Sequence, residues 1–168
     1  VAFKTIVCAV DFSEASRRAL DYALSLAQEA DGRLLLLHAL EGPQPAVNAQ
    51  FDVQKVRRGL AEDAQEHLEA LVPDHARAWC EAEAIVRYGK AHREVLRVAA
   101  DRHADLIVLG VQGRGAIDLT LFGSTTQHVI RAATCPVLTV GGRAAMKSGY
   151  DYYPSELPSP QVPSLPFV

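Results

Sequence analysis

The clearest strand signal in the sequence is the run Ala104-Asp-Leu-Ile-Val-Leu-Gly110, in which four large apolar residues, Leu106 to Leu109, follow one another without a break. Strands covered by helices on both faces have this continuous apolar character, and they belong to parallel sheets. Four similar runs occur elsewhere in the chain, of which the third is the most mixed. The five predicted strands span residues 5–10, 34–40, 84–87, 105–111 and 136–140.

Segments with helical periodicity separate these strands. The first has Ser13 as a predicted N-cap and Gly32 as a predicted stop signal. The others span about residues 53–71, 91–102 and 125–133, and the last begins with Ser124 and Gln127 at the spacing of a capping box. Because strand and helix alternate without a hairpin signal, we predict an α/β fold, an open doubly wound five-stranded parallel sheet with right-handed crossovers.

Glycines are concentrated after the fourth predicted strand, at Gly110, Gly113 and Gly123, and Ser124 and Thr125 follow directly. In a doubly wound sheet a ligand binds beyond the carboxyl ends of the strands, where this segment lies. Glycine lets the backbone approach phosphate oxygens closely, and a helix N-terminus attracts anions. The segment therefore predicts a phosphate ligand, although it matches neither the G-x-x-x-x-G-K-[ST] loop nor the G-x-G-x-x-G fingerprint.

The spacing G-x2-G-x9-G-[ST], from Gly110 to Ser124, resembles the ATP-binding signature of the universal stress protein family. The family pattern also matches the start Lys4-Thr-Ile-Val-Cys-Ala-Val-Asp11-Phe-Ser13, the run Leu34-Leu-Leu-Leu-His38-Ala39 and the ending Cys135-Pro-Val-Leu-Thr-Val140. The resemblance covers residues 3–140, nearly all of a predicted nucleotide-binding domain at 1–140. It implies a Rossmann-like sheet, similar to that of the adenine nucleotide alpha hydrolases.

The resemblance also implies a set of nucleotide contacts. Asp11 would lie against the nucleoside, and Ala39 would line the adenine pocket. The ribose and phosphates would be held by Gly110, Gly113, Gly123, Ser124 and Thr125. The bound nucleotide would be ATP, or ADP or AMP, accompanied by Mg²⁺ that the phosphate oxygens hold with at most one side chain, such as Asp11.

Several residues have an ordinary structural interpretation as well. Asp11 is of the type that stabilises a turn after a strand, and Ser124 would cap a helix with or without a ligand. We interpret His38, in an apolar strand, as a hydrogen-bonded core histidine, and Lys90 and His92 as a solvated helix start. No catalytic or metal-ligating side chain is assigned, and the sequence contains no H-x-x-x-H and no C-x-x-C.

Composition and charge exclude several function classes. The chain has 168 residues, enough for one well-buried domain, and a formal net charge of −3 without a basic stripe, which argues against a nucleic-acid partner. Its three cysteines, spread along the chain, indicate free thiols in a reducing compartment. No apolar run approaches the roughly 20 residues of a membrane span and no signal peptide is recognised, so we expect a cytoplasmic protein without a membrane partner.

The C-terminal residues 141–168 lack helical or strand periodicity and hold five of the nine prolines, which predicts an extended tail. Its aromatic side chains, among them Tyr150, Tyr152 and Tyr153, favour docking on a partner subunit; the alternative is a remnant of expression without a role. The last predicted strand would form a sheet edge, which tends to pair with a second chain. The resemblance implies a homodimer through that strand, which the tail could extend.

These observations favour an ATP-binding regulatory protein whose nucleotide stabilises or reshapes the domain. Fast phosphoryl transfer is not expected, because neither a P-loop lysine nor an evident general base accompanies the glycines. The alternative is a slow ATPase or another nucleotide-processing enzyme of the same fold. Such enzymes tend to place a glycine-rich loop after the first strand, where this chain has Asp11-Phe-Ser-Glu-Ala-Ser16. An assembly module that lost its ligand is disfavoured by the intact glycine spacing.

Overall fold

The computed structural model describes residues 2–42, 51–111 and 123–141, so the predicted tail at 141–168 lies outside them except for Gly141, which ends the last strand. The strands are β1 (Thr5–Ala9), β2 (Arg33–Leu40), β3 (Glu81–Tyr88), β4 (Leu106–Val111) and β5 (Val137–Gly141). The helices are α1 (Glu14–Ala30), α2 (Phe51–Ala70), α3 (Ala91–Asp101) and α4 (Ser124–Ala132), with a 3-10 helix η1 (Ala76–Ala78). None of the helices in these ranges is long and apolar enough to cross a membrane.

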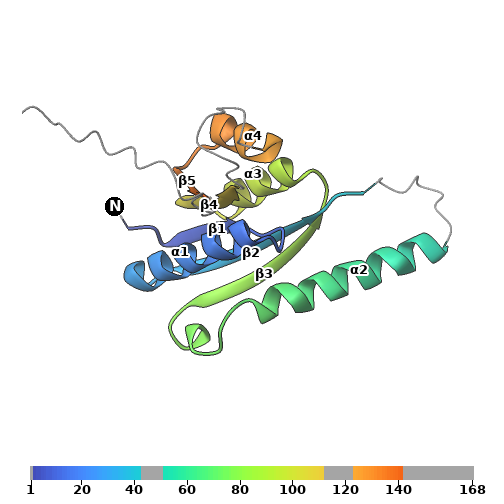
Figure 1. Ribbon diagram of the computed structural model, residues 1–168, viewed down its shortest axis with the longest axis horizontal. Coiled ribbons are helices and arrows are strands. Elements are labelled where there is room, and N and C mark those ends of the chain that lie inside the picture. The colour runs from blue at the N-terminus through green and yellow to red at the C-terminus, as the bar shows by residue number, and fades with distance from the viewer. Residues whose placement is uncertain (1, 43–50, 112–122, 142–168) are drawn as a thin grey trace, which may run out of the picture.

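All five strands are parallel and form one sheet in the order β3-β2-β1-β4-β5, which confirms the predicted fold class (Figure 1). β1 lies at the centre, with β2 on one side and β4 on the other. The chain adds β2 and β3 on one side of β1, and then returns to add β4 and β5 on the other. The winding therefore reverses between the carboxyl ends of β1 and β4, where sheets of this type bind ligands.

Helices cover both faces of the sheet and bury two apolar clusters. One cluster joins Ile6 of β1 to Ala23 of α1 and Leu68 of α2. The other joins Val7 of β1 to residues of α3 and α4, among them Val95. Because successive strand residues point to opposite faces, the neighbours Ile6 and Val7 belong to different clusters. Continuous apolar strands are thus explained by burial on both sides.

β3 is longer than the predicted span of 84–87, because it occupies Glu81–Tyr88. It lies at the edge of the sheet, where Glu83 and Arg87 are exposed to solvent. Charged residues are tolerated in such a strand, so the apolar run that marks it is short. The 3-10 helix η1, which precedes β3, was not predicted either.

The residues just before and just after α1 in the chain set where this helix begins and ends. Ser13 is its N-cap, as predicted, and its hydroxyl accepts a hydrogen bond from the N–H of Ser16 at 3.2 Å. The helix ends with Asp31 in the left-handed region, at φ 48°. Gly32, the predicted stop signal, follows it for a different reason: a Cβ there would lie 2.8 Å from the carbonyl oxygen of Phe3. This glycine lets the chain pass close to the start of β1.

Candidate functional site

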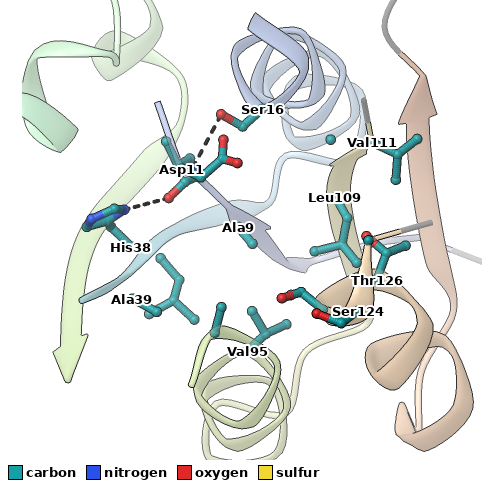
Figure 2. A pocket seen from close by; sticks show the side chains of 16 residues that line it. Ala9, Asp11, Ser16, His38, Ala39, Val95, Leu109, Val111, Ser124 and Thr126 are labelled. Carbon is teal, nitrogen blue, oxygen red and sulfur yellow. Dashed lines mark hydrogen bonds between the residues drawn. The ribbon is translucent and has the colours of Figure 1, made fainter. Parts of the chain in front are cut away.

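A pocket of about 480 Å³ opens at the carboxyl ends of β1, β2 and β4, where the winding of the sheet reverses (Figure 2). The first turns of α3 and α4 form its other side. It is lined by Ala9, Val10, Asp11, Ser16, Leu37, His38, Ala39, Ala91, Val95, Leu109, Gly110, Val111, Gly123, Ser124, Thr125 and Thr126. Six of the seven predicted site residues lie in this set, and the seventh, Gly113, falls outside the described residues.

Part of the pocket wall is apolar. Leu37, Val95 and Leu109 are almost fully buried and belong to the second apolar cluster, so their positions are fixed by packing. Ala39 and Ala91 add small side chains beside them. Binding pockets for small molecules commonly combine such a wall with a few polar groups. This wall suits a flat apolar surface such as the face of an aromatic ring.

Asp11 follows β1, and its carboxylate forms a tight local turn. Oδ1 accepts a hydrogen bond from the N–H of Ser13 at 3.0 Å, which is the turn-stabilising role expected of a short polar residue. Partial burial raises the pKa of Asp11, but hydrogen bonds from Ser13 and Ser16 outweigh it and hold the pKa below its usual range. The side chain is exposed at the pocket, so an ionised carboxylate is available as an acceptor for hydroxyl groups.

His38 ends close to the same turn and lines the pocket, which sequence reasoning did not anticipate. Its Nδ1 lies 2.7 Å from the carbonyl oxygen of Val10 (Figure 2). A carbonyl oxygen only accepts, so Nδ1 carries the proton and donates it. The histidine is hydrogen-bonded, as predicted, but it is half-buried at the pocket rather than enclosed in the core.

The N-terminus of α4 forms the polar side of the pocket. Its N-cap is Gly123, whose carbonyl accepts from the N–H of Gln127 at 3.2 Å, so the predicted capping box of Ser124 and Gln127 is wrong. The helix begins one residue earlier than that box requires, and Ser124 lies in its first turn. The N–H groups of the first turn have no carbonyl partner within a helix. Together with the hydroxyls of Ser124 and Thr126, which Figure 2 shows beside the pocket, they attract anions.

Two predicted glycines play different parts in this geometry. A Cβ on Gly110 would lie 2.5 Å or less from the carbonyl group of Ala15, so Gly110 lets α1 approach β4. The structure thus assigns to Gly110 a packing role that the sequence did not suggest. A Cβ on Gly123 would meet no atom of residues 2–42, 51–111 or 123–141 within 4 Å, so these residues leave its space open at the pocket.

Charge is unevenly distributed around the pocket. Among the described lining residues, Asp11 is the only formally charged one, and the positive end of the α4 dipole adds partial charge of the opposite sign. Lys90 and His92, at the start of α3, do not line the pocket. Burial lowers the pKa of His92, and His128, which stacks on it with ring centroids 4.5 Å apart, lowers it further. In the described part of the chain, no three His, Cys, Asp or Glu side chains gather as a metal site.

Sequence reasoning missed Ser16, His38, Thr126 and the apolar wall as parts of the pocket. Ser16 lies three residues after the N-cap Ser13, which places it in the first turn of α1. Because that turn must lie near the end of β1, this spacing could have predicted Ser16 as a pocket residue. Thr126 directly follows two predicted residues on the same helix turn. The apolar wall carries no signal of its own, because its residues are indistinguishable from other buried strand and helix residues.

Known proteins share both the sequence pattern and the fold. The model of the universal stress protein family matches residues 2–141. A universal stress protein of Thermus aquaticus is 34% identical over 142 residues, which are 82% of this chain and 98% of the relative. The solved structure of UspA from Lactobacillus plantarum has a TM-score of 0.69 at 23% identity and covers 83% of this chain and 99% of its own. A universal stress protein from Archaeoglobus fulgidus in complex with dAMP has a TM-score of 0.58 at 22% identity, with coverage of 83% and 99%.

Proposed function

Because this chain belongs to the universal stress protein family, we propose that its pocket binds an adenine nucleotide, which is ATP, ADP or AMP. The observation that carries the proposal is that three kinds of surface meet around one pocket: an apolar wall, the Asp11 carboxylate and the N-terminus of α4. A base, a ribose and a phosphate group are the three parts of an adenine nucleotide. The complex of a protein of the same fold with dAMP supports this assignment.

Each part of the nucleotide has a matching group in the pocket. The adenine would lie against Ala39 and Val95, where apolar side chains face the pocket. The ribose hydroxyls would donate hydrogen bonds to Asp11, whose lowered pKa keeps it ionised at neutral pH. The phosphates would accept from the N–H groups of the first turn of α4 and from the hydroxyls of Ser124 and Thr125.

The pocket favours binding over rapid turnover. The titratable side chains among its described lining residues are Asp11 and His38. Asp11 has a lowered pKa and is a weak base, and the described lining residues include no lysine or arginine that would neutralise the charge developing on a transferred phosphoryl group. Mg²⁺ would neutralise charge on a bound triphosphate, and the donor set fits an ion held mainly by phosphate oxygens with at most one ligand from Asp11. We therefore propose a regulatory nucleotide binder in which any ATP hydrolysis is slow.

The same proposal includes a homodimer through β5. Among the strands that the structure describes, β5 pairs with β4 alone, so its other edge could present backbone groups to a second chain. The N–H of Ile107 donates to the carbonyl of Pro136 at 3.0 Å, which sets the register of this pair. In a parallel ladder with that register, the backbone N–H groups of Leu138 and Val140 point to β4, and the backbone N–H of Thr139 points to the other edge of β5.

The test is nucleotide titration of the wild type and Gly123→Val, preceded by native mass spectrometry of the purified protein for bound nucleotide. A branched side chain at 123 fills the space beside the first turn of α4, where a Cβ meets no atom of the described residues within 4 Å, so it should block the phosphates and leave the described fold intact. Gly59→Val on α2 is the matched control, because a Cβ there also meets no atom within 4 Å in the part of the chain that the structure describes. Isothermal titration with ATP, ADP and AMP measures the dissociation constants.

The expected result is tight binding by the wild type and Gly59→Val, with at least about tenfold weaker binding by Gly123→Val, equal to about 1.4 kcal/mol. Phosphate release from bound ATP, measured over hours, should be slow in all three. Equal affinity of the wild type and Gly123→Val would reject the phosphate position. Failure of the wild type to bind any adenine nucleotide would reject the function.

A further inference from the structure

We infer that His38 is a positioning residue that aims the Asp11 carboxylate at the ribose; this inference rests on the proposed nucleotide-binding function. His38 and Asp11 come from different strands, β2 and the end of β1, and both line the pocket. His38 acts on the two residues that flank Asp11 rather than on Asp11 itself. Two separate contacts carry this argument.

The first contact fixes the peptide unit between Val10 and Asp11. The carbonyl of Val10 accepts from Nδ1 of His38 at 2.7 Å, and the N–H of the same peptide unit, on Asp11, donates to Oγ of Ser16 at 3.4 Å. The N–H of Val10 in turn donates to the carbonyl of Leu37, the residue before His38, at 2.8 Å. The Val10–Asp11 peptide plane is therefore held on one side by β2 and on the other by α1.

The second contact holds Phe12, the residue that follows Asp11. Phe12 has a φ of 62°, in the left-handed region that bulky residues rarely adopt. Its ring lies against that of His38, with centroids 4.6 Å apart, and edge-on to that of His67, with centroids 6.3 Å apart. A conformation of this kind persists only where surrounding contacts enforce it. The imidazole of His38 thus secures both neighbours of Asp11.

This arrangement matters for binding because the carboxylate depends on the same turn for its direction. Oδ1 accepts a hydrogen bond from the N–H of Ser13, hydrogen bonds from Ser13 and Ser16 lower the pKa of the carboxyl group, and the side chain is exposed to the pocket. The direction of the carboxylate is consequently set by the backbone on either side of it. A hydrogen bond weakens steeply as its geometry departs from linear, so a turn that relaxes would lose the ribose contact before it lost the base or the phosphates.

The test compares two substitutions whose side-chain amide nitrogen takes the place of one or the other ring nitrogen of His38. In His38→Asn the amide nitrogen occupies the place of Nδ1 and can still donate to Val10. In His38→Gln the amide nitrogen occupies the place of Nε2 and cannot. The readout is the ratio of affinities for ATP and 2′,3′-dideoxy-ATP, which isolates the ribose hydroxyls. Amide hydrogen exchange at Ser13, whose N–H donates to Asp11, reports the turn in the absence of nucleotide.

The wild type should prefer ATP over the dideoxy analogue by about tenfold, the value of a hydrogen bond to a charged group. We expect His38→Asn to keep most of that ratio, and His38→Gln to bring it close to one and to speed exchange at Ser13. If the role of His38 were purely structural, the substitutions would weaken the binding of ATP and of the dideoxy analogue equally. If Nε2 of His38 contacted the ligand directly, His38→Gln would keep the preference for ATP and His38→Asn would lose it. Either result overturns the inference. A wild type that binds neither nucleotide rejects the proposed function, and one that binds both equally rejects the ribose contact at Asp11.

Discussion

Gly110 and Ala15 are in direct backbone contact, because the first turn of α1 packs onto β4 where that strand enters the pocket. A Cβ on Gly110 would lie 2.4 Å from the carbonyl carbon of Ala15 and 2.5 Å from its oxygen. Neither partner is a flexible side chain that could move aside. The glycine therefore joins the packing of the fold to the shape of the site.

Gly110→Ala should destabilise the protein, whereas Gly123→Ala should not. The added methyl group at 110 meets backbone atoms of α1, and overpacking of this kind costs about 2–3 kcal/mol. The methyl group at 123 meets no atom of the described residues within 4 Å, and Ala is only a poorer N-cap than Gly, so the free energy of unfolding should change by less than about 1 kcal/mol. Urea denaturation measures both values. Equal stability of the two variants would contradict the packing role of Gly110.

Stability should fall in acid partly through Asp11. A carboxyl group whose pKa is lower in the folded state stabilises the protein above its unfolded pKa of about 3.9, and this contribution is lost as the pH falls through the lower folded value. Asp11→Asn lacks that contribution at every pH. The gap in melting temperature between wild type and Asp11→Asn should be largest near neutral pH and should close at the acid end of a pH series. A gap that stays constant would show that the hydrogen bonds of the turn do not act on the carboxylate.

The three thiols should react in an order set by their burial. Burial raises the pKa of Cys8 to about 12, and its side chain has no exposed surface. Cys80 is also buried, while Cys135 is only half-buried. Because the thiolate is the reactive form, iodoacetamide at pH 8 should modify Cys135 first and Cys8 only after unfolding. Peptide mass spectrometry over time measures the order, and early modification of Cys8 would contradict it.

The β5 interface can be tested with two proline substitutions in neighbouring positions. Thr139→Pro removes an N–H that points to the free edge, so it should weaken dimerisation by at least about tenfold and keep the fold. Leu138→Pro removes an N–H that faces β4, so it should destabilise the domain itself. Sedimentation velocity measures association, and circular dichroism melting measures the fold. Unchanged association of Thr139→Pro would place the interface elsewhere.

Features that depend on residues close together in the chain could be predicted from the sequence. The runs at 34–40 and 105–111 predict parallel strands, because burial on both faces leaves no place for charged side chains. Ser13 was recognised as a cap because its partner, the N–H of Ser16, lies only three residues away. The same reasoning failed for Ser124, because whether the helix starts at 124 or 125 depends on the path by which the chain enters it. It failed also for β3, whose exposed edge position hides the apolar pattern.

Features that depend on contacts between distant segments appear only when the chain is folded. Gly110 is spaced like a phosphate-binding glycine, but its close neighbour is α1, almost a hundred residues earlier in the chain. His38 has the character of a core histidine, and its role follows from Val10, 28 residues away, which the pairing of β1 with β2 brings within hydrogen-bond distance. Spacing along the chain indicates which residues can serve a site. Packing between elements sets the direction in which they point, because the positions of backbone groups from separate strands and helices are unrelated until the core assembles.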